Sequence, residues 1–301
     1  MVKVQNSGII EITTPATLYV LATPIGNLGD LSPRALGILR DVDVIAAEDT
    51  RHTAPLLSHF GLPTKRLLAV HDHNQQQAAN GLINLLAQGK SIALVSDAGT
   101  PAVSDPGAIV VRAVLDAGYT VVPIPGACAA VAALSASGMG EAGFVFLGFL
   151  PAKSSGRISV LKDWLASPLA LILYESPHRI VESLSDICAL FEGERRIAIC
   201  REITKKFETI VVLPAKNIAA YLSENAATLR GEFVLVIDSY TPQTIDVPAE
   251  NAELARVLGV LLKSVSVKQA SVLAAELVGC GKNEAYDMAL KMKAEHTKND
   301  D

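Results

Sequence analysis

The chain has 301 residues, half of them apolar, which is enough for more than one buried core. Its formal net charge of −5 excludes a protein that coats nucleic acid by overall positive charge, although it does not exclude local basic clusters. The four cysteines lie far apart without a CxxC pair, so their spacing indicates neither a zinc site nor a disulfide framework.

The start of the sequence shows no basic segment followed by an apolar run, so we expect no signal peptide. No stretch reaches the roughly 18 unbroken apolar residues that a membrane-spanning helix needs. We therefore expect a cytoplasmic protein with reduced thiols and no membrane role.

Short β-branched runs alternate with helical patterns through the first half of the chain, as in βα units around a mainly parallel sheet. The expected strands cover 18–22, 42–47, 66–70, 92–96 and 120–124, and the expected helices cover 33–40, 53–60, 76–88 and 107–117. Three pairs place a capping side chain before a proline, which is a helix-start signal: Ser32-Pro33, Asp105-Pro106 and Ser176-Pro177.

After a helix near 127–137, further strands are expected at 144–149, 169–174, 196–201, 208–213 and 232–238, and their close spacing predicts a mixed sheet. Residues 239–248 contain two prolines and have the composition of a linker. Residues 250–295 give three helical patterns, compatible with a helix-turn-helix or with a small bundle. The predicted fold class is α/β, with an N-terminal α/β domain over 1–125, a second α/β domain over 126–240, and a linker with a C-terminal helical segment over 241–301.

The loops after the strands are rich in glycine, proline and polar residues. In an open parallel sheet, ligands bind at the carboxyl ends of strands, so these loops are expected to meet on one rim. They read TPIGNLGD, EDTRHT, HDHN, SDAGTPAVSDPG and PGACAA in the first half, and YESPHR and REITKK in the second. Neither GxxxxGK[ST] nor GxGxxG follows the first strand, which argues against a P-loop or an ordinary dinucleotide-binding fold.

These blocks, with GFLPAKSSGR and GEFVLVI, resemble the tetrapyrrole-methylase family in one order from about Leu18 to Ile237, and within it the branch that methylates small-subunit ribosomal RNA. The resemblance implies two α/β domains with S-adenosylmethionine between them, and a homodimer. It also implies 2′-O-methylation of a cytidine in the decoding region of 16S rRNA, with the 30S subunit as the expected substrate.

The resemblance also implies which residues contact the cofactor. The family often has Gly-Asp-Pro where this chain has Gly99-Thr100-Pro101, so Asp97 is the nearest carboxylate. Tyr174 has an aromatic face that attracts cations and could face the sulfonium, or it could be a buried strand-end tyrosine. The implied cofactor residues are Ile25, Gly26, Asp97, Gly99, Thr100, Val103, Cys128, Ala129, Tyr174 and Phe233.

Methyl transfer from a sulfonium to an alcohol is an in-line displacement, in which positioning supplies much of the catalysis and a carboxylate or neutral histidine accepts the hydroxyl proton. We expect Glu48, Asp49 and Arg51 to shape the substrate side, although Asp49 and Arg51 also suit a structural ion pair. The sequence does not select a base among these and the other rim residues, which are His52, His71, Asp72, His73, Glu175, His178 and Glu202.

The same loops contain candidate residues for contacts with phosphate and for metal binding. Arg179, Arg201, Lys205 and Lys206 are expected near RNA phosphates. His71 and His73 share the spacing of a strand face, but no third ligand is evident, so we expect no metal.

Three alternative functions stay open at this point. A tetrapyrrole-precursor methyltransferase would keep the cofactor, but the EDTRHT and YESPHR blocks and the helical tail speak against it. A nucleotide- or phosphosugar-binding hydrolase would need a metal or a phosphate loop. A non-catalytic ribosome-assembly factor would bind RNA and cofactor without turnover.

Overall fold

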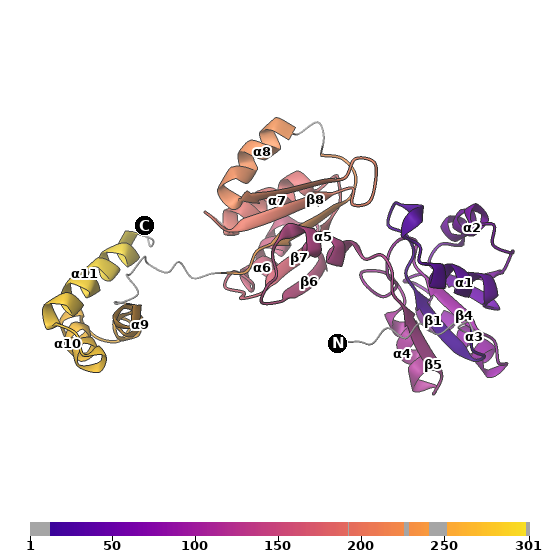
Figure 1. The fold of residues 1–301 in the computed structure, drawn as a ribbon, viewed down its shortest axis with the longest axis horizontal. Helices are drawn as coiled ribbons and strands as arrows, with labels where there is room; N and C mark the ends of the chain where they lie inside the picture. The colour runs from indigo at the N-terminus through magenta and orange to yellow at the C-terminus, as the bar shows by residue number, and fades with distance from the viewer. Residues whose placement is uncertain (1–12, 192, 226–228, 241–251, 299–301) are drawn as a thin grey trace. The chain divides into compact units, whose positions relative to one another are not determined.

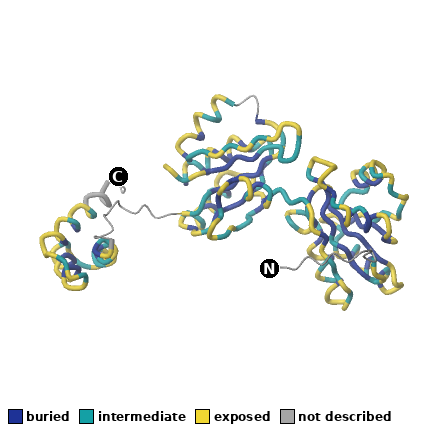
Figure 2. Tube along the Cα trace, in the orientation of Figure 1, coloured by how far each residue is buried: buried dark blue, intermediate teal, exposed yellow. Residues whose placement is uncertain are grey.

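The computed structural model describes residues 13–191, 193–225, 229–240 and 252–298. The chain divides into two compact units, 1–240 and 241–301, which are described separately. The first unit holds two five-stranded sheets (Figure 1), and the inner strands of both sheets are buried, whereas the edge strands are only partly buried (Figure 2).

The first sheet was predicted to be mainly parallel and is entirely parallel, in the order β3-β2-β4-β1-β5. Its strands are β1 (Thr17–Leu21), β2 (Val44–Ala47), β3 (Arg66–Ala69), β4 (Ile92–Val95) and β5 (Thr120–Ile124). The helices that connect them are α1 (Pro33–Asp41), α2 (Thr50–His59), α3 (Gln75–Ala87) and α4 (Ala108–Asp116).

Side-chain alternation along β1 explains why both faces of this sheet are covered. Tyr19 and Leu21 pack with residues of α1 and α2, whereas Leu18 packs with residues of α3 and α4. Because βαβ connections are right-handed, the chain places α1 and α2 on one face as it winds one way, and α3 and α4 on the other as it returns. The connections after the neighbouring strands β1 and β4 therefore run to opposite faces of the sheet. Open α/β sheets bind ligands at such a point.

The second sheet is mixed, as predicted, in the order β6-β7-β10-β8-β9, with only β6 and β7 parallel. Its strands are β6 (Phe144–Phe149), β7 (Ala170–Glu175), β8 (Arg196–Arg201), β9 (Thr209–Pro214) and β10 (Phe233–Ile237). One face packs on α6 (Ser154–Lys162), α7 (Ile180–Leu190) and α8 (Ile218–Asn225), and the other packs on α5 (Ala129–Ser137). Short 3-10 turns cover Leu28–Asp30 and Ala215–Asn217.

A buried arginine joins α6 to α7. Arg157 is 1 % exposed, and its guanidinium lies 2.8 Å from the Asp186 carboxylate of α7. Its Nη1 donates to the carbonyl of Ala152 at 2.6 Å. The charge is thus compensated where water does not reach it, as a buried ion requires.

Two of the proline-based helix starts were wrong in detail. Ser32 caps α1 as predicted, because its side chain accepts from the Ala35 amide. In contrast, α4 begins after Gly107, and Asp105 does not cap it. Ser176 opens a turn, and α7 begins only at Ile180.

The second unit contains α9 (Ala252–Leu261), α10 (Val267–Val278) and α11 (Lys282–Lys298), which share an apolar core. Ser266 and Gln269 form a capping box at the start of α10, and Gly279 ends it in the left-handed conformation at φ 76°. The predicted linker lies, from residue 241 on, outside the described residues. No helix within the described ranges is long and apolar enough to cross a membrane.

Candidate functional site

The carboxyl ends of β1 and β4 are joined by backbone hydrogen bonds. The Thr23 amide donates to the Gly99 carbonyl at 2.8 Å, and the Gly99 amide donates to the Thr23 carbonyl at 3.0 Å. The buried Thr23 hydroxyl donates to the Ser96 carbonyl at 3.1 Å. These bonds fix the two loops against each other at the switch point of the sheet.

The backbone conformation at Gly99 favours glycine, and two other loops approach it closely. Its φ is +86°, and a Cβ at this position would lie 3.3 Å from Ile25 Cγ2 and 3.7 Å from the Ala127 carbonyl oxygen. The Thr100 hydroxyl donates to the same carbonyl at 3.0 Å. The loops after β1, β4 and β5 therefore meet at Gly99, and the structure brings Ile25, Gly99 and Thr100 together.

An open cavity of about 510 Å³ lies beside this junction. We call it the α5 cavity, and its walls include Ile25, Asp30, Ala127, Cys128, Ile203 and Thr204. The Thr204 hydroxyl, from the loop after β8, donates to Asp30 Oδ2 at 2.6 Å and so connects the two sheets across it. This volume lies in the usual range of pockets for small molecules and cofactors.

Tyr174 and Phe233, the predicted residues from the second sheet, lie in different environments. The Tyr174 hydroxyl accepts from the Ala130 amide at 3.2 Å, and its ring makes edge contacts with Phe146 and Phe149. Burial and the nearby Cys128 thiol raise the pKa of Tyr174 to about 12, so its hydroxyl keeps its proton. Phe233 is buried in the core beneath α6–α8.

The other implied cofactor residues lie on the same loops. The Val103 amide donates to the Thr100 carbonyl at 3.3 Å. Cys128 and Ala129 begin α5 without a side-chain cap. Gly26 has a φ of +151°, and the Lys205 side chain lies across it, because an added Cβ would be 2.5 Å from Lys205 Cγ.

A cluster of carboxylates lies at the ends of β2 and β4. The Asp97 amide donates to Glu48 Oε2 at 3.2 Å, and the Asp49 amide donates to Asp97 Oδ1 at 3.0 Å. His52 Nδ1 lies 2.8 Å from Asp97 Oδ2, and this contact raises the pKa of His52. Burial raises the pKa of Glu48, while the hydrogen bond from the Asp97 amide opposes this shift and the charge of Asp97 adds to it.

Asp105 belongs to this cluster, although sequence reasoning assigned it only to a helix start. It lies between Ser104, at φ 63°, and Pro106, in a loop where Ala102 is also left-handed at φ 67°. Burial and then the charge of Glu48 raise the pKa of Asp105 to about 6, while a hydrogen bond with Ser96 opposes the shift. Its place in the sequence SDPG gave no signal of this environment.

We expect Asp105→Asn to stabilise the protein at neutral and alkaline pH. The carboxyl pKa is about 6 in the folded protein and about 3.8 in the unfolded chain, so the folded state keeps the proton longer. Asp105 therefore costs stability as pH rises from about 4 through 6, and the cost is complete above that range. Discounted for partial exposure, it is about 1–2 kcal/mol.

Urea unfolding of Asp105→Asn at pH 8 and pH 4.5 measures this effect. The gain should be full at pH 8 and should shrink at pH 4.5. Asp116→Asn, which removes an exposed carboxylate at the end of α4, controls for the change in net charge. An equal gain from both variants, or a gain independent of pH, would contradict the assignment.

Asp49 and Arg51 hold the start of α2. Asp49 is the N-cap, and its Oδ1 accepts from the Arg51 amide at 2.8 Å. The hydrogen bond from the Arg51 side chain lowers the pKa of Asp49 to about 2. These contacts explain why α2 begins three residues earlier than predicted.

Glu175, another rim carboxylate, is buried and accepts from the Ser183 hydroxyl and the Ser176 amide.

Three of the four predicted phosphate contacts have partners within the protein. Arg179 donates to the Leu150 carbonyl at 2.7 Å and pairs with Glu175 at 3.2 Å. Lys205 pairs with Glu232 at 2.7 Å and with Glu202 at 3.0 Å.

Arg201 Nε donates to the Arg230 carbonyl at 2.8 Å. Lys206 is exposed, with its ammonium 5.5 Å from the centre of the Phe207 ring.

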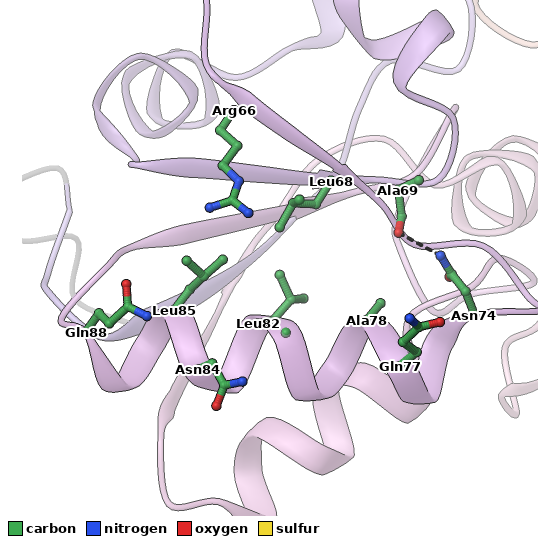
Figure 3. Close-up of a pocket in the computed structure, with 11 residues that line it drawn as sticks. Arg66, Leu68, Ala69, Asn74, Gln77, Ala78, Leu82, Asn84, Leu85 and Gln88 are labelled. Carbon is green, nitrogen blue, oxygen red and sulfur yellow. Dashed lines mark hydrogen bonds between the residues drawn. The ribbon is translucent and has the colours of Figure 1, made fainter.

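Two other cavities lie in the first sheet's half of the unit. One, the α2 cavity, measures about 410 Å³ and lies between α2 and the loop after β1, with Asp97 in its wall. The other, the α3 groove, measures about 490 Å³ and is lined by amide side chains of α3 and by Arg66 (Figure 3). The Asn74 amide closes one end of the groove by donating to the Ala69 carbonyl at 3.0 Å. None of the predicted site residues lines the α3 groove, so volume alone does not identify the site.

His71 and His73 have ring centroids 6.2 Å apart. No group of three or more potential metal ligands occurs among the described residues.

Comparison with known proteins gives consistent results. The family of Tetrapyrrole (Corrin/Porphyrin) Methylases matches residues 17–219, and the RsmI C-terminal HTH domain matches residues 248–293. Two relatives named ribosomal RNA small subunit methyltransferase I are similar over most of both chains. That of Escherichia coli O157:H7 is 48 % identical and covers 92 % of this chain and 95 % of its own. That of Pseudomonas aeruginosa is 46 % identical and covers 91 % and 97 %.

Solved structures with the same fold are more distant. Uroporphyrin-III C-methyltransferase from Thermus thermophilus, complexed with S-adenosyl homocysteine, is 17 % identical with a TM-score of 0.52, covering 74 % of this chain and 97 % of that one. A diphthine synthase is 16 % identical with a TM-score of 0.55, covering 75 % and 90 %. These similarities show the two-sheet fold.

Proposed function

Because the chain belongs to the tetrapyrrole methylase family, and within it to the ribosomal RNA small subunit methyltransferase I branch, we propose that it methylates the 2′-hydroxyl of a cytidine in the decoding region of 16S rRNA. The chain is an S-adenosylmethionine-dependent methyltransferase, and 16S rRNA is its substrate. The methylated atom, the base and the use of the assembled 30S subunit belong to the proposal, as does a cytoplasmic location.

The observation that carries the site is the meeting of three strand-end loops around Gly99, beside the α5 cavity. We place S-adenosylmethionine there, where Ile25 and Cys128 line the cavity. The other implied residues lie on the same loops and at the start of α5: Gly26, Gly99, Thr100, Val103 and Ala129. Asp97, the carboxylate nearest to Gly99-Thr100-Pro101, lines the neighbouring α2 cavity, and Tyr174 supports the start of α5 through Ala130. Phe233 supports the second sheet from its core.

The residues that fit this cofactor also suggest how the reaction proceeds. Bound S-adenosylmethionine supplies a methyl group on a sulfonium. The loops orient it for in-line displacement, which requires reacting atoms about 3–3.5 Å apart. Glu48 and Asp105 both have raised pKa values, so either carboxylate suits acceptance of the hydroxyl proton near neutral pH.

The remaining predicted residues position the RNA. Asp49 and Arg51 shape the substrate side by fixing the first turn of α2. We place Arg201 and the exposed Lys206 near phosphates, while Arg179 and Lys205 hold the loops on which these residues lie.

We also propose a homodimer. Phe207, Ile210 and Val212 are exposed on and beside the edge strand β9, at 62 %, 37 % and 37 %. Such an apolar edge is a surface that a second copy would cover.

Transfer of labelled methyl from S-adenosylmethionine to 30S subunits tests the function. The subunits come from a strain that lacks this protein, and the product is digested to nucleosides. We expect labelled 2′-O-methylcytidine, and little label on free 16S rRNA. Label in another nucleoside would refute the proposed atom and base. Cofactor binding without any transfer would favour a non-catalytic assembly factor, and transfer to a tetrapyrrole would favour the precursor methyltransferase.

A further inference from the structure

The α2 cavity is separate from the α5 cavity but shares a loop with it. Pro24 and Gly26 line the α2 cavity, whereas Ile25 between them lines the α5 cavity. Consecutive residues of one loop therefore face two different cavities. A molecule in the α2 cavity would be a close neighbour of one in the α5 cavity.

One face of α2 forms the wall opposite this loop. His52, Leu56 and His59 are spaced at i, i+4 and i+7, which places them on one side of the helix, and all three line the cavity. Together they present two imidazole rings and an aliphatic side chain. Flat aromatic rings and apolar groups of this kind are the surfaces on which unpaired nucleobases stack.

Asp97 adds a hydrogen-bond acceptor to the cavity. Its Oδ1 accepts from the Asp49 amide, and its Oδ2 contacts His52 Nδ1. A carboxylate has about four lone-pair sites, so these contacts fix its orientation and leave acceptor capacity for a ligand. Carboxylates accept from the exocyclic amino group of cytosine, and uracil has a carbonyl oxygen in its place.

We propose that the α2 cavity binds the target cytosine, turned out of the RNA, with Asp97 accepting from its amino group. This inference rests on the proposed function, because it assigns the acceptor base to a cavity beside the cofactor loops. Enzymes that modify a base take it out of the stack into a pocket of this kind, and a base held in the same way here would also fix the position of the 2′-hydroxyl on its ribose. The α3 groove lacks both features, since neither a carboxylate nor an aromatic ring lines it.

Filling the cavity tests the proposal. Leu56→Trp places a large ring among the lining residues, and Ser58→Trp places the same ring on an exposed position of α2 that does not line the cavity. We expect Leu56→Trp to lower kcat/KM for 30S subunits at least tenfold and to change the Kd for S-adenosylmethionine less than twofold. Ser58→Trp should leave both unchanged. Wild-type kcat/KM in Leu56→Trp would overturn the proposal.

A binding measurement keeps this test independent of turnover. Cytidine monophosphate should shift the imidazole NMR signals of His52 and His59, with inorganic phosphate as the control. Uridine monophosphate should shift them less, and equal shifts would refute the role of Asp97. If the nucleotide shifts the signals while the wild-type enzyme methylates no RNA, the proposed function fails and the pocket stands. Absence of any shift overturns the pocket.

Discussion

Gly99→Ala should weaken binding of S-adenosylmethionine at least tenfold. An added Cβ would lie 3.3 Å from Ile25 Cγ2, so the Ile25 side chain in the wall of the α5 cavity would have to shift, and 3.7 Å from the Ala127 carbonyl oxygen, an ordinary contact. The left-handed backbone adds a conformational cost of about 1–2 kcal/mol. Isothermal titration of the cofactor and urea unfolding measure the two effects separately.

Gly118→Ala is the matched control for this variant. Gly118 follows α4 with a φ of +81°, close to that of Gly99, but nothing lies within 4 Å of an added Cβ there. Both variants should therefore lose similar backbone stability, and only Gly99→Ala should lose cofactor affinity. Equal cofactor affinity in the two variants would show that the cofactor does not depend on the junction at Gly99.

Arg157→Ala should destabilise the first unit by about 3–5 kcal/mol, because removal of one partner leaves a poorly solvated charge. Asp186 would lose the guanidinium at 2.8 Å while keeping the Ser154 hydroxyl at 2.9 Å, and the Ala152 carbonyl would lose a donor. Fluorescence of Trp164, the single tryptophan, reports this unfolding, since its side chain packs on the same core as α6 and α7.

Two further variants separate charge burial from general damage. Replacing both partners, as Arg157→Met with Asp186→Leu, should recover a large part of the stability because no unpaired charge remains. Lys216→Ala breaks the exposed pair with Glu194 in the same unit and should leave the urea midpoint unchanged. A loss below about 1 kcal/mol for Arg157→Ala would mean that water reaches Asp186.

The strand pattern was predictable from sequence because burial on both faces leaves continuous apolar runs. β2 and β4 show this, since every residue of Val44–Ala47 and Ile92–Val95 is buried. The role of Ser32 as the N-cap of α1 was equally predictable, because this cap depends only on the next three residues. Helices α6 and α8 were missed, and α6 has a sequence, SSGRISVLK, without a clear apolar stripe.

The loops that form the site were predictable from the sequence, but the side-chain contacts of its residues were not. The glycines and the strand-end position brought Ile25, Gly99 and Thr100 together as expected. The pairing of Lys205 with Glu232 joins residues that are 27 positions apart, and no local pattern indicates it. Asp105 is a comparable case, because its raised pKa arises from burial and from Glu48, which lies on another strand-end loop.

The segment between β5 and α5 has a thermodynamic consequence for the enzyme. It leaves the first sheet after Ile124, supplies the Ala127 carbonyl that Thr100 contacts, and enters a helix that packs on the second sheet. The wall of the α5 cavity is therefore built from both halves of the unit. If RNA binding alters the fit of these halves, the affinities for RNA and cofactor must be linked, and each ligand changes the affinity of the other by the same factor.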